Sequence, residues 1–153
     1  MGKEIERKFL VKDNSFIQMT TELLHICQTY ISDKPESTVR IRVCDDHAWI
    51  TVKGKNDGAV RDEWEYAIPV NDAMEMAERL AGGWNIDKTR YVVIYEGARW
   101  EVDVFHGRHD GLVLAEIELS SASDSFVLPP FIGDEVTGDP RYYNSVLAAH
   151  KQL

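Results

Sequence analysis

The chain of 153 residues has little cysteine, no apolar run long enough to cross a bilayer and no low-complexity tract. Its two cysteines, Cys27 and Cys44, follow neither a CxxC nor another metal-binding spacing, so we expect free, partly buried thiols. A membrane-spanning helix would need ~20 consecutive apolar residues, so no membrane association is expected. Residues 1–11 carry charges where a signal peptide has its apolar stretch, which predicts a cytoplasmic protein.

Basic residues are fewer than acidic residues, because the chain has 17 Lys and Arg and 26 Asp and Glu, which gives a net charge of −9. This balance argues against nucleic-acid polymers and anionic membranes as partners. A small polyanionic ligand stays compatible with it, since charges can segregate within a fold. The length, together with the absence of a linker or a repeat, predicts a single domain over residues 1–153.

Short segments of alternating residues, separated by turn signals, dominate the chain. Asp45-Asp46 and Glu96-Gly97 are tight-turn signals, and most neighbouring segments read as hairpins. The pattern predicts a mainly β (α+β) fold with a largely antiparallel sheet of eight strands, over residues 3–11, 25–32, 37–44, 47–54, 60–69, 85–95, 98–105 and 111–120.

A few helices accompany the strands. We expect a helix from an Asn71 cap to Leu80, ended by Gly82, with a core-facing stripe that includes Met74 and Ala77. Asp139-Pro140 reads as the start of a C-terminal helix that runs toward Ala149. A short helix from Ser15 also fits the polar stretch before the second strand.

Charged residues two apart recur in seven of the strands. Residues at this spacing share one face of a strand. The sets are Glu4, Glu6 and Lys8; Arg40 and Arg42; Lys53 and Lys55; Glu63 and Glu65; Lys88 and Arg90; Glu101 and Asp103; Glu116 and Glu118.

Two arrangements explain these sets. One is an ordinary half-buried sheet with its charges in solvent. The other is a closed eight-stranded barrel with a charged lumen and an apolar outer face that peripheral helices partly cover. The like-charge doublets favour the barrel, because like charges on one strand face repel unless opposite charges lie across from them.

A lumen of this kind needs a ligand, because desolvated charges must be paired or must meet one. Arginine and lysine donate to phosphate oxygens, and clustered carboxylates are ligands for Mg²⁺ or Mn²⁺. Carboxylates, a metal and phosphates together are the usual parts of phosphoryl transfer.

The N-terminal Glu4-Ile5-Glu6-Arg7-Lys8 resembles the ExExK motif of the CYTH superfamily, the triphosphate tunnel metalloenzymes. Further matches follow in order over nearly the whole chain. They are TVRIR (38–42), TVKGK (51–55), EWEY (63–66), DKTRY (87–91), WEVDVF (100–105), LAEIEL (114–119) and GDEVTGDPRYYN (133–144). The compact length and the last motif resemble short bacterial members, several of which are inorganic tripolyphosphatases.

The resemblance implies a role for each matching position. Triphosphate-binding residues would be Lys8, Arg40, Arg42, Lys53, Lys88 and Arg90, and metal ligands Glu4, Glu6, Glu116, Glu118 and Asp103. Tyr30 matches a tyrosine that pairs with the lysine equivalent to Lys53 in related short members, a proposed base for the attacking water. Metal-bound water is the alternative base. Further candidates for the site are Glu63, Glu65, Glu101, Lys55 and Arg141, and Arg141 either closes one tunnel end or packs a helix.

The function that follows is hydrolysis of a small-molecule triphosphate, first of all inorganic tripolyphosphate to pyrophosphate and phosphate, with Mg²⁺ or Mn²⁺. Hydrolysis of thiamine triphosphate or a nucleotide is the alternative, followed by adenylyl cyclase activity and by a non-catalytic polyphosphate-binding module. The four metal-type glutamates argue against the last, because binding alone needs mainly the cations. Whether two copies form a homodimer stays open.

Overall fold

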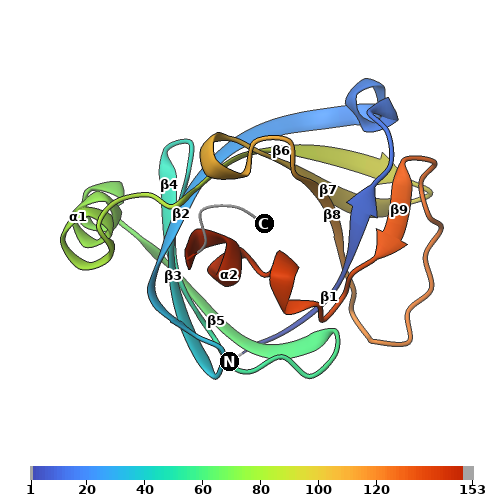
Figure 1. The fold of residues 1–153 in the computed structure, drawn as a ribbon. Helices are drawn as coiled ribbons and strands as arrows, with labels where there is room; N and C mark the ends of the chain where they lie inside the picture. The colour runs from blue at the N-terminus through green and yellow to red at the C-terminus, as the bar shows by residue number, and fades with distance from the viewer. Residues whose placement is uncertain (1, 150–153) are drawn as a thin grey trace.

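A computed structural model describes residues 2–149, in which eight antiparallel strands close into a barrel (Figure 1). Around the barrel the order is β5-β4-β3-β2-β6-β7-β8-β1, and pairing of β1 with β5 closes the ring. The strands are β1 (Gly2–Val11), β2 (Thr20–Lys34), β3 (Ser37–Cys44), β4 (His47–Lys53), β5 (Val60–Ile68), β6 (Ile86–Tyr95), β7 (Ala98–Phe105) and β8 (Val113–Glu118). The closed barrel predicted from the charged sets is confirmed.

The strand β1 changes partners along its length. Its residues 2–5 pair with β5, and its residues 6–10 pair with β8 on the other edge. Beyond the residues of β1 that pair with β5, a short ninth strand, β9 (Ile132–Glu135), pairs with Phe9 and Val11. This outer strand was not expected from the sequence, and it covers an edge of β1 that would otherwise be bare.

Tight turns join the hairpins as predicted. Asp45 (φ 54°), Glu96 (φ 49°) and Gly97 (φ 76°) adopt the left-handed backbone that two-residue hairpin turns require. These turns fix the register of β3 with β4 and of β6 with β7, so Arg40 with Arg42 and Lys88 with Arg90 point into the barrel together.

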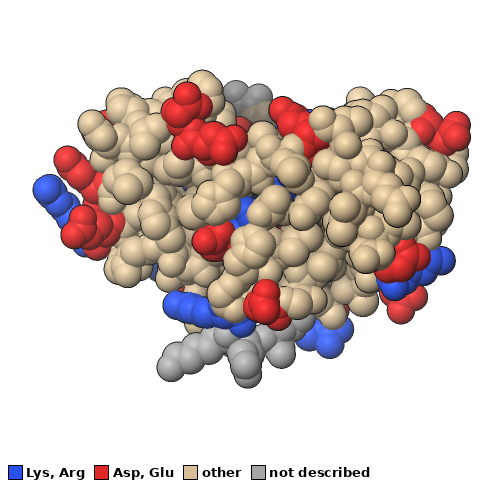
Figure 2. Space-filling view, turned by 90° about the horizontal axis from the view of Figure 1, so that it is seen from above, with Lys and Arg blue, Asp and Glu red and all other residues tan. Residues whose placement is uncertain are grey.

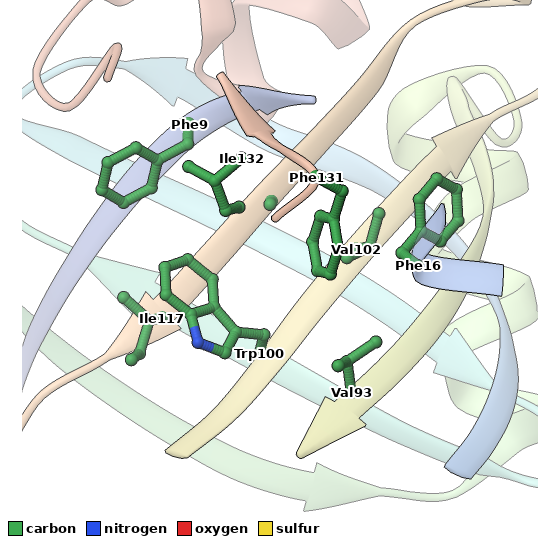
Figure 3. Close-up of a cluster of buried hydrophobic side chains, with 9 residues drawn as sticks. Phe9, Phe16, Val93, Trp100, Val102, Ile117, Phe131 and Ile132 are labelled. Carbon is green, nitrogen blue, oxygen red and sulfur yellow. The ribbon is translucent and has the colours of Figure 1, made fainter. Parts of the chain in front are cut away.

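The largest hydrophobic cluster lies outside the barrel wall. Figure 3 shows Phe131 and Ile132, at β9, over Trp100 and Val102 of β7. Phe16, from the 3₁₀ turn η1 (Ser15–Met19), packs into the same cluster. Outward apolar residues are therefore covered by peripheral segments, and the charged side chains that line the cavity occupy inward positions.

Helix α1 (Val70–Ala81) covers a second part of the outer wall, over β2, β3 and β4 (Figure 1). The expected cap and stripe were wrong in detail. Pro69 occupies the N-cap position rather than Asn71, and the residues that meet the barrel are Ala73 and Ala77, whereas Met74 is 51% exposed. Small alanine side chains at this spacing let the helix approach the strands closely.

The C-terminal segment crosses the ring of strands. Asp139 accepts a hydrogen bond from the Arg141 backbone and caps only the 3₁₀ turn η3 (Pro140–Tyr142), so the predicted continuous helix is wrong. A separate helix, α2 (Asn144–Ala149), follows and lies inside the ring in Figure 1. Its Leu147 packs against Phe105 and Leu114, which fixes the segment at one end of the lumen.

The view of Figure 2 shows a surface made mostly of uncharged side chains, with acidic and basic groups gathered in a few places. The 3₁₀ turn η2 (Gly107–His109) follows β7 at the end of the barrel that α2 occupies. Within residues 2–149, the structure has no helix long and apolar enough to cross a membrane.

Candidate active site

A cavity of about 240 Å³ occupies the barrel interior, and every one of the eight barrel strands contributes to its lining. The lining is almost wholly polar. It includes most of the residues singled out from the sequence: Glu4, Glu6, Lys8, Tyr30, Arg40, Arg42, Lys53, Glu63, Glu65, Arg90, Glu101, Glu116 and Glu118. The shared strand parity therefore brings the predicted residues together.

Guanidinium groups from β3 and β6 form a cationic wall. Burial, together with the charges of Arg40 and Arg90, lowers the pKa of Arg42 to about 10. Arg40 donates from Nη2 to Thr51 Oγ1 at 3.1 Å, but its Nε is buried with no hydrogen-bond partner among the described residues. An unpaired buried donor is costly, and an anion held between these groups would satisfy it.

Arg90 is held in place from behind by Asp103. The carboxylate of Asp103 accepts from Arg90 Nε at 2.8 Å, from Arg90 Nη2 at 3.0 Å and from Lys88 Nζ at 2.7 Å. Although burial opposes the charged form, the two cations hold the pKa of Asp103 well below its usual range. Both Asp103 and Lys88 are buried, and neither lines the cavity.

Lys88 and Asp103 therefore sit differently from what the sequence indicated. Burial is the main reason that the pKa of Lys88 falls, to about 8, and its ammonium also donates to Asn144 Oδ1 at 3.2 Å. Its two hydrogen-bond partners, Asp103 and Asn144, hold the ammonium inside the barrel but outside the lining of the cavity. Asp103 is likewise saturated by cations, so its geometry is that of a support for Arg90.

Carboxylates gather on the opposite wall, formed by β1 and β8. Glu6 lies directly across from Glu118 in the strand register. Burial and the neighbouring Glu116 and Glu4 raise the pKa of Glu6 well above its usual value. Burial would also raise the pKa of Glu116, but Lys8 and the hydrogen bond with Glu6 outweigh it and lower that pKa to about 2.

This acidic wall suits a hard divalent cation. The charges of Glu116 and Glu4 oppose ionisation of the buried Glu6, so the carboxylates of this wall repel one another when all are charged. A cation bound by Glu4, Glu6, Glu116 and Glu118 would relieve this repulsion, and oxygen ligands are those that such cations prefer.

Lys53 lies at the edge of the acidic wall. Its ammonium donates to both oxygens of Glu4 at 2.9 Å and lies 3.5 Å from Glu63 Oε2. The hydroxyl of Tyr30 instead accepts from Gln28 Nε2 at 3.4 Å, and Gln28 Oε1 accepts from Arg42. Among the described residues, Lys53 and Tyr30 thus have separate hydrogen-bond partners, although both line the same cavity.

A family model described as "CYTH domain" matches residues 2–143. The chain belongs to the CYTH family. An inorganic triphosphatase of Acetivibrio thermocellus is 47% identical over 147 residues, 96% of this chain and 94% of that protein. One of Nitrosomonas europaea is 36% identical over 149 residues, 95% of this chain and 96% of that protein.

A solved structure has the same fold. The crystal structure of the inorganic triphosphatase NE1496 gives a TM-score of 0.66 at 33% identity, with 96% of this chain and 98% of that chain covered. Membership of the CYTH family implies a divalent metal, in agreement with the carboxylate wall.

Two weaker candidates lie away from the cavity of this CYTH barrel. Lys55 is exposed beyond the end of β4, and Arg141 is exposed and bound to Asp139 at 2.7 Å. Their positions follow local geometry, since Lys55 belongs to the turn after the strand and Arg141 to the capped turn η3.

Sequence reasoning missed several residues that line the CYTH cavity. Arg61 precedes Glu63 by two and faces the lumen, where it donates from Nη2 to Thr38 Oγ1 at 3.2 Å. The alternation along β5 could have indicated it. The lining also includes Thr137, Tyr143, Asn144 and Ser145, which the C-terminal crossing brings in and strand parity does not predict.

Proposed function

We propose that this CYTH protein hydrolyses inorganic tripolyphosphate to pyrophosphate and phosphate inside the barrel, with Mg²⁺ or Mn²⁺. The observation that carries the proposal is the cationic wall facing a carboxylate wall across one small cavity. The inorganic triphosphatases at 47% and 36% identity support it. The reaction breaks one P–O–P bond, and water supplies the oxygen and protons of the two products.

The charged residues inside the barrel have different roles in the proposed reaction. Arg40, Arg42 and Arg90 bind phosphate oxygens, and Lys8 adds a fourth cation near Glu116. Asp103 and Lys88 position Arg90. The glutamates of β1 and β8 would hold the divalent cation, which would neutralise charge on the phosphoryl oxygens.

Lys53 and Tyr30 are proposed to act at the attacking water. As an ammonium between Glu4 and Glu63, Lys53 is placed to bind phosphate; as a neutral amine it would accept the proton of water. Tyr30 is tied through Gln28 to Arg42, so its hydroxyl lies on the substrate-binding side. The two roles of Lys53 predict different pH profiles.

The cavity volume favours an inorganic substrate. About 240 Å³ is less than the ~300–1,000 Å³ that pockets for drug-sized ligands occupy, so a nucleoside would have to extend out of the barrel. A triphosphate chain without an organic group needs only the polar lumen.

Phosphate release tests the proposal directly. Tripolyphosphate, thiamine triphosphate and ATP are supplied separately with Mg²⁺ or Mn²⁺, and cyclic AMP is sought in the ATP reaction. We expect the highest kcat/KM with tripolyphosphate, loss of activity in a chelator and no cyclic AMP. A higher kcat/KM for thiamine triphosphate or ATP would contradict tripolyphosphate as the substrate. Turnover without a divalent metal would contradict a role of the carboxylate wall as a metal site.

A further inference from the structure

Three metal-binding side chains converge on the outer wall, away from the lumen. Asp87 Oδ1 lies 2.7 Å from His25 Nε2, and Cys27 Sγ lies 3.8 Å from the same nitrogen. One ligand atom from each residue falls within 4.8 Å of the others. The three belong to two adjacent strands, so the barrel itself brings them together.

The strand register makes this grouping rigid. His25 and Cys27 are two apart on β2 and share its outer face, and Asp87 of β6 is the direct partner of Cys27. The next position on β6, Lys88, faces inward to Asp103. A ligand at the outer group is thus separated from the tunnel by the barrel wall.

A neighbouring histidine is already engaged. His106, just after β7, has its Nε2 2.7 Å from Thr89 Oγ1, and Thr89 is the strand partner of His25. The outer site therefore consists of three protein ligands, His25, Cys27 and Asp87, and a water can take a further position because His25 and Asp87 are exposed.

A nucleophilic cysteine does not account for this arrangement. In a Cys–His–acid relay the thiol and the carboxylate contact different ring nitrogens, whereas here both approach Nε2 of His25. Three donor atoms within 4.8 Å of one another are instead compatible with a shared cation.

We propose that His25, Cys27 and Asp87 form a second metal site, for Zn²⁺ or a similar thiophilic divalent ion, distinct from the tunnel cation. Thiolate, imidazole and carboxylate are the ligands of Zn²⁺, whereas Mg²⁺ prefers oxygen alone. Binding releases the thiol proton and links β2 to β6. In tetrahedral coordination the ligand atoms stand ~3–4 Å apart, so the 2.7 Å hydrogen bond between His25 and Asp87 must open, whereas the 3.8 Å separation of Cys27 from His25 already fits.

Cobalt spectroscopy tests the site on the whole protein. Co²⁺ is titrated into metal-free, phosphine-reduced protein in excess Mg²⁺, and sulfur-to-cobalt charge-transfer absorption is recorded in the near ultraviolet. The tunnel glutamates offer only oxygen and cannot produce this band. We expect the band at one equivalent of Co²⁺, lost in Cys27→Ser and retained in the matched control Cys44→Ser.

Zinc affinity and stability give a second readout. Calorimetric titration of Zn²⁺ should show one site that Cys27→Ser or His25→Gln weakens by more than the ~10–100-fold typical of outer-sphere partners. With the tunnel filled by excess Mg²⁺, Zn²⁺ should raise the Tm of the wild type and Cys44→Ser but not of Cys27→Ser. With Mg²⁺ alone, tripolyphosphate hydrolysis by Cys27→Ser should match the wild type, which shows that the variant folds.

The outcomes are distinct from those of the function test. No charge-transfer band in the wild type, or a band lost only in Cys44→Ser, would overturn the outer site. A band in a protein that does not hydrolyse tripolyphosphate would support the site and contradict only the proposed function.

Discussion

The ammonium of Lys53 is held 2.9 Å from both carboxylate oxygens of Glu4, across the seam where the barrel closes. Lys53 belongs to β4 and Glu4 to β1, and Glu63 of the intervening β5 lies 3.5 Å from the same ammonium. Lys53 and a cation bound in the tunnel would therefore compete for the carboxylate of Glu4.

Replacing Lys53 by methionine should therefore affect metal binding and turnover in opposite directions. Without triphosphate, Lys53→Met should bind Mg²⁺ about tenfold more tightly, the ratio expected if the competing pair contributes ~1.4 kcal/mol. Its kcat with tripolyphosphate should fall. Calorimetric titration measures the first effect, with Lys55→Met outside the cavity as the control. Unchanged Mg²⁺ affinity would mean that Lys53 and the cation do not share Glu4.

The pH–rate profile separates the two roles of Lys53. If its neutral amine is the base, Lys53→Ala and Tyr30→Phe should lower kcat more than they raise KM, and Lys53→Ala should lose or shift the acidic limb. We expect this result. The exposed Tyr66→Phe serves as the control. An intact acidic limb with only KM altered would assign Lys53 to phosphate binding.

Arg40 should matter mainly for substrate capture. Arg40→Ala removes a buried guanidinium with a free Nε, and hydrogen bonds to charged groups contribute ~1.5–3 kcal/mol, so kcat/KM should fall about 10- to 100-fold. Initial rates against tripolyphosphate concentration measure this. Arg79→Ala, on the exposed surface of α1, should leave the kinetics unchanged. Equal kinetics for both variants would remove Arg40 from the binding wall.

Asp103 should be essential for stability because it neutralises two buried cations. Asp103→Asn leaves Lys88 and Arg90 without their carboxylate, and breaking a buried pair in this way costs ~3–5 kcal/mol. Urea unfolding measures the loss. The exposed pair of Lys3 with Asp62 provides a matched control, and Asp62→Asn should change stability by ~1 kcal/mol or less. Similar losses in both variants would contradict the supporting role of Asp103.

The metal-free protein should gain stability as the pH falls from neutrality. The pKa of Glu6 is raised in the folded state, so the folded protein takes up this proton before the unfolded chain does, and stability rises down to the unfolded value near 4.5. Below 4.5 it should fall, because the pKa values of Glu116 and Asp103 are lowered and their stabilisation is lost on protonation.

Glu6→Gln isolates the upper part of this profile. The variant should be more stable than the wild type at pH 7 in a chelator and should show a flatter response between pH 7 and 4.5, as followed by urea unfolding. Glu75→Gln, on the exposed side of α1, should keep the wild-type profile. A wild-type profile with no rise toward acid pH would argue against the Glu6–Glu116 repulsion.

Strand parity explains why so much of the site could be predicted. A period of two placed Arg40 with Arg42 and Glu116 with Glu118 on one face each, and closing the sheet turned these faces inward. Strand parity does not predict how far a side chain on the inner face reaches into the cavity. Lys88 has the same parity as Arg90, yet Asn144 of the C-terminal segment meets its ammonium and shuts it off from the cavity.

The features that could not be predicted from the sequence depend on contacts between distant segments. Nothing local in Ile132–Glu135 distinguishes a strand from a loop, because its pairing comes from the edge of β1 that β5 leaves. Lys8 is likewise tied to the carbonyl of Tyr142 at 2.9 Å, a contact between opposite ends of the sequence. Such partners lie outside any short window of residues.

The change of partners along β1 has a consequence for how the chain is made. Its edges pair with β5, β8 and β9, so β1 can pair only after segments more than fifty residues later in the chain have been made. The hairpins from β2 to β5 and from β6 to β8 join neighbours, and they are able to pair as they emerge. Pairing between distant strands is slow because the entropy cost of closing the loop comes before the favourable contacts form. We therefore expect closure by β1 to be a late step of folding, before which the sheet is open and its unpaired edges are exposed to chaperones and to aggregation.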